Sequence, residues 1–427
     1  MKKSTRKRRA SNPRTSPTTS SAPPAILAPF GPDLLGDKLR GMVGGVIQEL
    51  VAAELAEALQ AARYQRPTDA ETRRGDRHTQ RSRELTTSLG PTTIQLQRAR
   101  LFDDAGEPTQ EWQSTRLPRY ARRAPAVDNA ILGADLAGTN TRRIRGALRP
   151  LLQDGPVSKS AVSRIIQTLK RAFEAWRTSP LTGKQIVFLF LDAIAVKVRS
   201  DRRVQTVPVL VAYGVHSNGD KELLAVRLMG SESGAAWHAM IDDLVARGLE
   251  PPVLCIIDGN AGLRRAVATA WPQTLVQRCV VHKLRNLEAH APKRAIDEVR
   301  ADFQSITTAE NEKRARVAYA RFVRSWQRRC ESVVTSLKEA GDELLTFYRF
   351  PPSQWKCLRT TNMIERLHLE FRRRIKTQAS LPNEGTVLRL FFALYQRGQI
   401  HMRRVDGWQQ IPVVLEQHAA EQLKSVA

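Results

Sequence analysis

The chain has 427 residues, and its 68 Lys and Arg against 42 Asp and Glu give a formal net charge of +26. This surplus favours a polyanionic partner, with nucleic acid ahead of a membrane surface, although charge carried only for solubility is the alternative. No apolar stretch approaches the roughly 18 to 20 residues of a membrane span. Four cysteines are too few for a disulfide framework, so we expect a cytoplasmic, nucleoid-associated protein without a membrane partner.

The N-terminal part is predicted to bind DNA. Residues 1–24 hold seven Lys and Arg and no acid, which predicts a disordered basic arm. Residues 25–180 begin with a helical pattern from Asp33 to Tyr64. A polar, Arg-rich loop or extended arm is then expected from Pro67 to Arg83, followed by a hairpin from Leu85 to Leu101.

Residues 139–176 have the pattern of a helix-turn-helix, with a turn at Asp154-Gly155 and a second helix capped by Ser158. Polar residues early in the second helix would then face the major groove. An ordinary helical hairpin is the alternative. The candidate DNA contacts in this region are Arg142, Arg143, Lys159, Ser160, Ser163 and Arg164.

Residues 185–291 change character. An apolar run from Ile186 to Leu191 predicts a buried strand, and Asn218-Gly219 predicts a hairpin turn between the next two strands. Helix, strand, helix and a fifth strand from Leu275 to Val281 follow. Three antiparallel strands and then this alternation are the order of a ribonuclease H-like α/β fold, and fold alone does not give chemistry.

The C-terminal part is predicted to interrupt and then complete this core. Residues 292–352 show no strand signal and predict an all-α insertion. Residues 353–405 are expected to carry two helices, around Thr361 to Lys376 and around Glu384 to Arg397. Residues 406–427 are expected to form a C-terminal tail.

Two aspartates are associated with predicted strands. Asp192 interrupts an apolar strand, where a charge is costly unless it is paired or bound to a metal. Asp258 ends another strand and is followed by Gly259. In the proposed strand order these two strands are neighbours, so the acids could converge at one sheet edge. Paired divalent cations about 3.5–4 Å apart are the usual device for in-line attack on a phosphodiester, although an Asp before Gly is often only a turn residue.

A third acid could come from the segment Arg359 to Lys376. On a helix, Asn362 and Glu365 share one face, and Glu365 could reach the metals. Glu370 is a rival, but its spacing from Glu365 places it on another face. A solvated helix rich in charge is the alternative. The basic residues expected to bind phosphates beside Glu365 are Arg366, Arg372, Arg373, Arg374 and Lys376.

Five ordered blocks resemble the bacterial insertion-sequence transposases of the mutator superfamily, a family of DDE enzymes. The resemblance covers roughly residues 35–400, and its departures are Met363, where the family commonly has Pro, and His368 with Leu369. The blocks are Leu191-Asp192-Ala193 to Arg199, Gly230 to Ser233 with Trp237, Ile257-Asp258-Gly259 to Leu263, Gln277 to His282 with Arg285-Asn286, and Arg359 to Arg366 with Pro382-Asn383-Glu384.

The resemblance implies a DDE transposase. Asp192, Asp258 and Glu365 would hold two Mg²⁺ ions, for which Mn²⁺ could substitute, and His282 would stand near the scissile phosphate. Arg285 would contact DNA. The partners implied are double-stranded DNA, as element ends and as target, and a second copy of the chain, because pairing two ends requires a dimer or a larger assembly.

Several alternatives remain open at this stage. Cys279 and His282 could be zinc ligands, but no second close pair completes a four-ligand site. Trp237 could stack on a base, although a Trp at the start of an amphipathic helix more often lies in the core. The whole chain could instead be a DNA-binding regulator with an inactive ribonuclease H-like domain, or a nuclease that cuts DNA without joining it.

Overall fold

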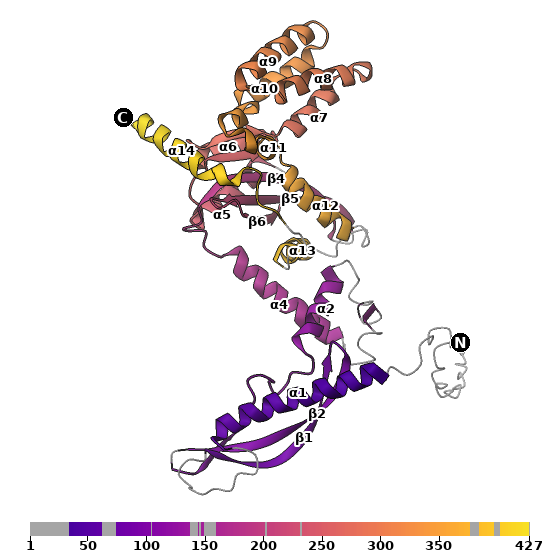
Figure 1. Ribbon diagram of the computed structural model, residues 1–427. Helices are drawn as coiled ribbons and strands as arrows, with labels where there is room; N and C mark the ends of the chain where they lie inside the picture. The colour runs from indigo at the N-terminus through magenta and orange to yellow at the C-terminus, as the bar shows by residue number, and fades with distance from the viewer. Residues whose placement is uncertain are drawn as a thin grey trace, which may run out of the picture. The chain divides into compact units, whose positions relative to one another are not determined.

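The computed structural model describes residues 34–61, 74–103, 105–136, 144, 147–148, 159–200, 203–230, 233–375, 384–396 and 402–426. The chain divides into two compact units, Met1–Ala124 with Leu151–Gly155 and Pro125–Pro150 with Pro156–Ala427. Both contain helices and sheets, so the structure is of the mixed α/β kind that the sequence predicts (Figure 1). Within the described parts of the chain, no helix is both long and apolar enough to cross a membrane.

The first unit is a helix on a three-stranded antiparallel sheet of order β1-β2-β3. The predicted hairpin is present, but its first strand begins ten residues before the expected start at Leu85, so part of the expected loop is strand. The register from Gly75↔Leu101 to Thr87↔Gly90 explains this, because pairing with β2 imposes the extended form on a polar segment. The elements are α1 (Leu34–Leu59), β1 (Gly75–Thr87), β2 (Gly90–Phe102) and β3 (Pro108–Glu111).

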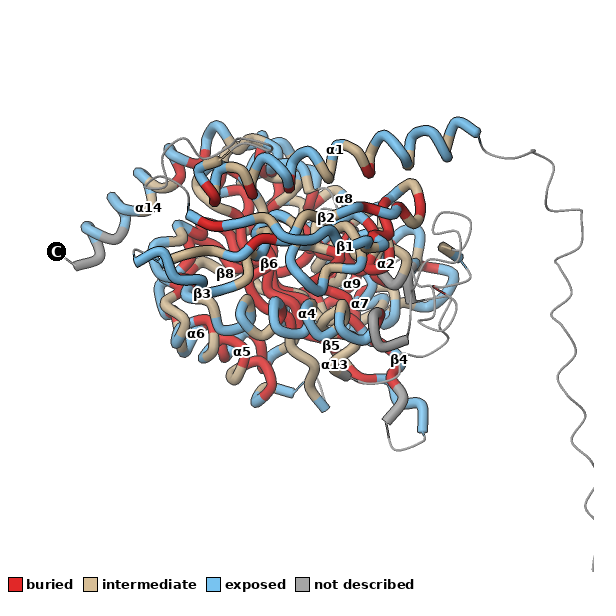
Figure 2. The backbone as a smooth tube through the Cα atoms, turned by 90° about the horizontal axis from the view of Figure 1, so that it is seen from below, coloured by how far each residue is buried: buried red, intermediate tan, exposed pale blue. Residues whose placement is uncertain are grey.

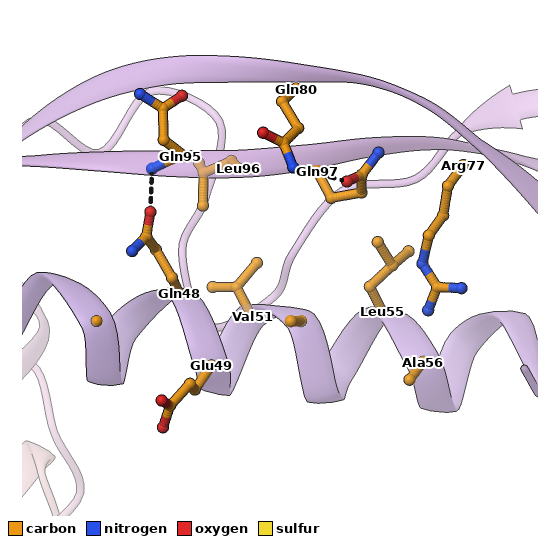
Figure 3. Close-up of a pocket in the computed structure, with 12 residues that line it drawn as sticks. Gln48, Glu49, Val51, Leu55, Ala56, Arg77, Gln80, Gln95, Leu96 and Gln97 are labelled. Carbon is orange, nitrogen blue, oxygen red and sulfur yellow. Dashed lines mark hydrogen bonds between the residues drawn. The ribbon is translucent and has the colours of Figure 1, made fainter. Parts of the chain in front are cut away.

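One face of α1 packs on this sheet. Its buried residues are Gly44, Val51, Leu55 and Leu59, and a Cβ on Gly44 would lie 2.9 Å from a methyl group of Thr92. Figure 3 shows Val51 and Leu55 directed toward the strands in a pocket between helix and hairpin. The helix therefore needs a small residue at 44 and apolar residues on this side.

The second unit is built on a five-stranded sheet of order β6-β5-β4-β7-β8. Strand β4 is antiparallel to β5 and parallel to β7, and β7 is parallel to β8. The predicted turn between β5 and β6 is confirmed: Gly219 has φ +82°, and the Asn218 side chain accepts a hydrogen bond from Asp220 N. The strands are β4 (Ile186–Ser200), β5 (Arg203–His216), β6 (Lys221–Leu228), β7 (Leu254–Ile257) and β8 (Leu275–Arg278).

The two faces of this sheet have separate cores, and its strands are largely buried (Figure 2). Leu189 and Leu191 pack with Trp237 and Leu263 beneath α5 (Gly234–Ala246) and α6 (Ala261–Ala270). Phe188 and Phe190 point to the other face because side chains alternate along a strand. That face is covered by helices that include α7 (Val280–His290), α12 (Asn362–Ile375) and α13 (Glu384–Gln396).

The predicted fifth strand is too long. The apolar residues Val280 and Val281 favoured its extension to 281, but β8 ends at Arg278 and α7 begins at Val280. The Cys279 N–H donates to Ile257 O at 2.7 Å, and the Val280 N–H donates to Arg359 O at 2.9 Å. These bonds turn the chain out of the sheet, so His282 lies in the first turn of a helix.

The described residues between β8 and α12 are mainly helical. The helices α8 (Ile296–Thr307), α9 (Glu312–Gln327) and α10 (Glu331–Ala340) pack around Phe303, Phe322 and Trp326 beside the sheet (Figure 1). Their own apolar interior explains how so long a segment can interrupt a sheet domain.

The remaining helices lie at the two ends of the second unit. Helix α2 is Pro125–Leu136, and α14 is Ile411–Val426, where the sequence reading placed only a tail. In α4 (Lys159–Arg177), Phe173 packs edge-on against Phe392 at a centroid distance of 5.7 Å, and Trp176 packs against the same ring in a tilted arrangement at 5.1 Å. This packing joins α4 to the sheet unit, so the boundary between units falls near residue 125 and not near 180.

Candidate active site

Asp192 and Asp258 lie at the same level on two neighbouring parallel strands. The register pairs Phe190 with Ile256, and each aspartate follows two residues later. Neighbouring strands lie about 4.8 Å apart. By alternation, both aspartates share the sheet face of Phe190 and Ile256, which is the face covered by α12. The sequence-based expectation that these strands are adjacent is confirmed.

The two aspartates have different surroundings. Asp192 is 4% exposed, and among the described residues its carboxyl group accepts a hydrogen bond from Ala193 N at 2.9 Å. Asp258 is half-buried and its Oδ1 accepts from Gly259 N at 2.5 Å and Asn260 N at 2.8 Å. Asn260 in turn caps α6 by accepting from Gly262 N and Leu263 N. The position of the Asp258 carboxylate is therefore fixed by a hydrogen-bonded turn, whereas the position of the Asp192 carboxylate is fixed by the strand that carries it.

Glu365 comes from the first turn of α12, as its predicted helical position requires. Thr361 precedes the helix, and its N–H and hydroxyl both approach Cys279 Sγ at 3.4 Å, which ties the start of α12 to the start of α7. The Glu365 carboxylate is half-buried and lies 3.4 Å from Arg285 Nη2. The rival acid, Glu370, instead pairs with Arg373 at 2.7 Å on the same helix.

The three acids interact electrostatically. The pKa of Asp192 is raised to about 7, chiefly by burial. The negative charges of Asp258 and Glu365 contribute to the rise, while the positive charge of His282 and the hydrogen bond from Ala193 N oppose it. The structure thus brings together Asp192, Asp258, Glu365 and His282, the four residues predicted to be catalytic.

His282 is a positive group at this site. The Cys279 thiol, as a hydrogen-bonding partner, raises the pKa of His282 to about 9, and Asp192 and Asp258 add to the effect against the cost of burial. The imidazole is therefore protonated at neutral pH. The thiol is buried and lies against Thr361, with no second Cys/His pair beside it among the described residues, so nothing in this arrangement favours zinc.

Sequence reasoning missed His368. It was noted only as a departure from the family pattern, yet it is 4% exposed on α12, and its Nδ1 lies 4.0 Å from Asp192 Oδ2. Burial, with the charges of Arg372 and His282, lowers the pKa of His368 to about 3, so the ring is neutral. A helical offset of three residues from Glu365 was the signal that placed it on the same face.

Sequence reasoning also missed a network at the Asp258 turn in which two buried cations share the half-exposed carboxylate of Glu339. Arg278 Nη2 donates to Gly259 O at 3.3 Å and to Glu339 Oε1 at 2.9 Å, and Lys283 Nζ donates to Glu339 Oε2 at 2.6 Å. Arg278 and Lys283 are 2% and 1% exposed. Gly259 has φ +152°, and a Cβ there would lie 2.6 Å from the Arg278 guanidinium. Glu339 of α10 therefore supports the turn that carries Asp258.

The residue types suit a hard divalent cation, which prefers carboxylate oxygen. A buried carboxyl whose pKa is raised by two neighbouring carboxylates is the electrostatic state that such a cation relieves. In the part of the chain that is described, however, no three His, Cys, Asp or Glu side chains are arranged closely enough to hold a metal. Asp192 and Asp258 lie on the sheet face that α12 covers, and the charges of Asp258 and Glu365 act on Asp192. The Glu365 carboxylate itself is engaged in a salt bridge with Arg285.

The predicted DNA contacts are only partly described. Ser163 and Arg164 are exposed on α4, and Arg285, Arg372 and Arg373 are exposed near the acids. Arg142, Arg143 and Lys376 lie outside the described residues, as does most of the first helix of the predicted helix-turn-helix. Four further predicted contacts lie in described helices, but their side chains are outside the described part of the structure. They are Lys159, Ser160, Arg366 and Arg374.

Trp237 lies in the core, and the base-stacking interpretation finds no support. The side chain is 0% exposed and packs among Leu189, Leu191 and Met240 under α5. Ser233 caps this helix by accepting from Ala236 N, which sets the indole on the inner side. A base would need an exposed ring face, and this ring has none.

Comparison with known proteins places these features in a family. The sequence model of the family described as "Transposase, Mutator family" matches residues 30–403. A transposase of insertion sequence element IS1081 from Mycobacterium tuberculosis is 33% identical over 368 residues, covering 86% of this chain and 85% of the relative. The transposase of ISRM5 from Rhizobium meliloti is 30% identical, covering 84% and 87%.

A third relative and one solved structure extend the comparison. The transposase of IS256 in transposon Tn4001 from Staphylococcus aureus is 28% identical, covering 87% of this chain and 91% of the relative. A chain of the Drosophila P element transposase strand transfer complex aligns over 68% of this chain and 84% of its own length. Its identity is 11% and its TM-score 0.28, which is too low to carry an argument.

Proposed function

Because the chain belongs to the mutator family of transposases, we propose that it moves an insertion sequence by DDE chemistry. It binds the terminal inverted repeats of its element, cleaves a phosphodiester bond at each end and joins the exposed 3′-hydroxyl to target DNA. Double-stranded DNA is its partner in both steps, and two copies of the chain act on paired ends.

The proposed architecture is a ribonuclease H-like catalytic core preceded by a DNA-binding region. The sheet order β6-β5-β4-β7-β8, with three antiparallel strands followed by two parallel ones, supports the first part. The exposed Ser163 and Arg164 on α4 support its role as the recognition helix of a helix-turn-helix.

The observation that carries the proposed chemistry is the equal level of Asp192 and Asp258 on adjacent parallel strands, together with a Glu365 carboxylate close enough to raise the pKa of Asp192. A buried charge with so few hydrogen bonds costs stability, so its presence at Asp192 calls for a functional reason. Two convergent strand acids with a third from a helix supply the oxygen ligands that phosphodiester chemistry requires.

Asp192, Asp258 and Glu365 would hold Mg²⁺, or Mn²⁺ in its place. Such ions, when bound, activate water or a 3′-hydroxyl and stabilise the leaving oxygen. Glu365 would then exchange its salt bridge with Arg285 for this role, which frees the Arg285 guanidinium for a DNA phosphate. The turn behind Asp258 fixes one carboxylate in advance, which lowers the cost of assembling the site.

His282 contributes positive charge at the reacting phosphate. Its proton is retained at neutral pH, so Nε2 or Nδ1 can donate to a phosphate oxygen that gains charge in the transition state. Exposed Arg372 and Arg373 on α12 continue this positive surface and hold the adjacent backbone, together with Arg366, Arg374 and Lys376.

The direct test is nicking of a duplex that carries the element's end sequence. Wild-type protein should cut it with Mg²⁺ or Mn²⁺ and not without, and Asp258→Ala should bind the duplex equally well but leave it intact. The matched control is Glu370→Gln, which removes a carboxylate from the same helix as Glu365 and should cut normally. Equal nicking by Asp258→Ala and wild type would refute the catalytic assignment.

One observation keeps a second function in view. The described acids do not yet form a closed ligand set, and Glu365 is paired with Arg285. A DNA-binding regulator with an inactive core would look the same. That function predicts specific binding to the element ends and no metal-dependent nicking by wild type, whereas a nuclease without strand transfer would cut and never join.

A further inference from the structure

Helix α1 has a second apolar face in addition to the one that packs on the hairpin. Its members are large, apolar and exposed, and we call them the α1 seam. They are Leu35, Leu39, Met42, Val46 and Leu50, with exposed fractions of 70%, 38%, 60%, 54% and 48%. Figure 2 shows α1 exposed along much of its length, with few buried positions.

The seam lies opposite the packed face. Its members are spaced by four, three, four and four residues, and at about 100° per residue they fall on the side away from Gly44, Val51 and Leu55. Figure 3 agrees, since Val51 and Leu55 point toward the strands and Glu49 points away from them. Helix α1 is thus apolar on two opposite sides, and among the described residues of its own unit only one side has a partner.

A seam of this spacing is the pattern by which one helix packs along another. Soluble proteins seldom expose contiguous apolar patches larger than a few hundred Å². We propose that the α1 seam is a self-association surface, on which α1 of a second copy of this chain packs in antiparallel orientation. The two helices would cross near Met42 and Val46, so that Met42 of each copy meets Val46 of the other.

Charge along the flank of the seam selects the antiparallel orientation. Lys38 lies beside the N-terminal half of the seam and Glu49 beside the C-terminal half, and both side chains are exposed. Neither forms an ion pair within the described part of the chain. An antiparallel pair brings Lys38 of one copy next to Glu49 of the other twice, whereas a parallel pair would place this flank of the two copies on opposite sides of the interface, so that neither ion pair forms.

The area of the seam predicts a weak dimer. Five partly exposed apolar side chains offer on the order of 500 Å² per copy, against about 800 Å² per partner in a standard stable interface. Association should therefore depend strongly on concentration. Two DNA ends held by two copies would strengthen it by raising the effective concentration, but the contact itself needs no DNA and no catalysis.

The test is sedimentation of the full-length protein over a range of concentrations, without DNA. Wild type should shift from monomer to dimer, and Met42→Glu/Val46→Glu should shift the midpoint at least tenfold upward. The control is Ala52→Glu, an exposed position of α1 outside the seam, which should dimerise like wild type. A wild type that stays monomeric, as it would if another part of the same chain covered the seam, overturns the proposal.

A charge swap tests the orientation and remains informative if the double glutamate variant misfolds. Lys38→Glu and Glu49→Lys alone should each weaken the dimer several-fold, and together they should restore it. A dimer that Lys38→Glu alone leaves unchanged or strengthens would overturn the antiparallel geometry. Unchanged dimerisation in all seam and flank variants would show that another surface associates. Normal nicking by a monomeric variant would leave the proposed chemistry intact.

Discussion

Two charged clusters include residues of the segment from Asp258 to Lys283, and they balance their charge in different ways. In the first, the buried cations Arg278 and Lys283 share the carboxylate of Glu339, and Arg278 also donates to the carbonyl of Gly259. In the second, Asp192 is buried, with a backbone hydrogen bond from Ala193 and two acidic neighbours, Asp258 and Glu365.

We call the cluster around Glu339 the supporting network and the acids Asp192, Asp258 and Glu365 the working site, because only the first has all of its charges paired. Burial opposes ionisation of Glu339, yet the hydrogen bonds from Lys283 and Arg278 prevail and lower its pKa, so the opposite charges of this cluster are paired. Burial is the main cause that raises the pKa of Asp192 to about 7, and among the described residues no Lys or Arg donates a hydrogen bond to its carboxyl group. Charge that the fold leaves uncompensated marks the place where a ligand is expected.

The largest effect should come from the acids of the working site. Asp258→Asn or Glu365→Gln should lower the cleavage rate on the order of a thousandfold, because each removes several kcal/mol of charge stabilisation from the transition state. Single-turnover cleavage of an end-sequence duplex measures this, with Glu370→Gln as the control. Comparable loss in Glu370→Gln would mean that α12 contributes a different acid.

Removal of Glu339 should chiefly affect stability. Glu339→Ala leaves Arg278 and Lys283 buried without a carboxylate, and because the Glu339 side chain is 52% exposed, the loss should cost about 1–2 kcal/mol in the free energy of unfolding, less than the loss of a fully buried pair. Urea unfolding measures this, and Glu331→Ala at the exposed start of the same helix should cost only a few tenths of a kcal/mol. If Glu339→Ala unfolds like Glu331→Ala, the network does not support the turn.

In contrast to Glu339→Ala, the substitution Asp192→Asn should increase the free energy of unfolding. The pKa of Asp192 is 3.8 when unfolded and about 7 when folded, so the folded state binds the extra proton between these values. The stability of the wild type should therefore fall as pH rises from about 4 to about 7. The variant lacks this loss, so at pH 8 without metal it should be on the order of 2 kcal/mol more stable than wild type, by urea unfolding.

A stability of Asp192→Asn below that of wild type at pH 8 would contradict this sign. Asp243→Asn is the contrasting variant, because Asp243 already has two cationic partners. It pairs with Arg227 at 2.7 Å and Arg247 at 3.6 Å, and its neutralisation should destabilise at the same pH.

The smallest effect should come from His282. Since its pKa is about 9, wild-type cleavage should decline above pH 9 as the positive charge is lost. His282→Gln should cleave about tenfold more slowly than wild type at pH 8, and its cleavage rate should not decline above pH 9. The pH–rate profile of both proteins measures this. An identical alkaline decline in His282→Gln would assign the titration to another group.

Much of the sheet could be predicted from sequence. The continuous apolar run at Ile186–Leu191 and the Asn218-Gly219 turn are strong local signals, and the structure has β4 and the hairpin turn there. The level of Asp192 with Asp258 followed from placing their strands side by side. Element ends were less predictable, because the bonds that end β8 come from Ile257 and Arg359, distant in sequence.

The supporting network could not be predicted for the same reason. Arg278 lies at the end of a strand, and Glu339 lies 61 residues away in a separate helical segment. No periodicity or spacing links them, since their pairing depends on how the insertion docks behind the Asp258 turn. The polar strand β1 was hidden in a similar way, because its partner β2 imposes its extended form.

The central claim is that the uncompensated acids form a divalent cation site and the compensated cluster does not. Titration calorimetry with Mn²⁺ on the full-length protein tests it without DNA or turnover. Wild type and Glu339→Gln should bind Mn²⁺, whereas Asp192→Asn, Asp258→Asn and Glu365→Gln should lose at least tenfold in affinity. Equal binding by wild type and Asp192→Asn, or no binding by wild type, would contradict the account.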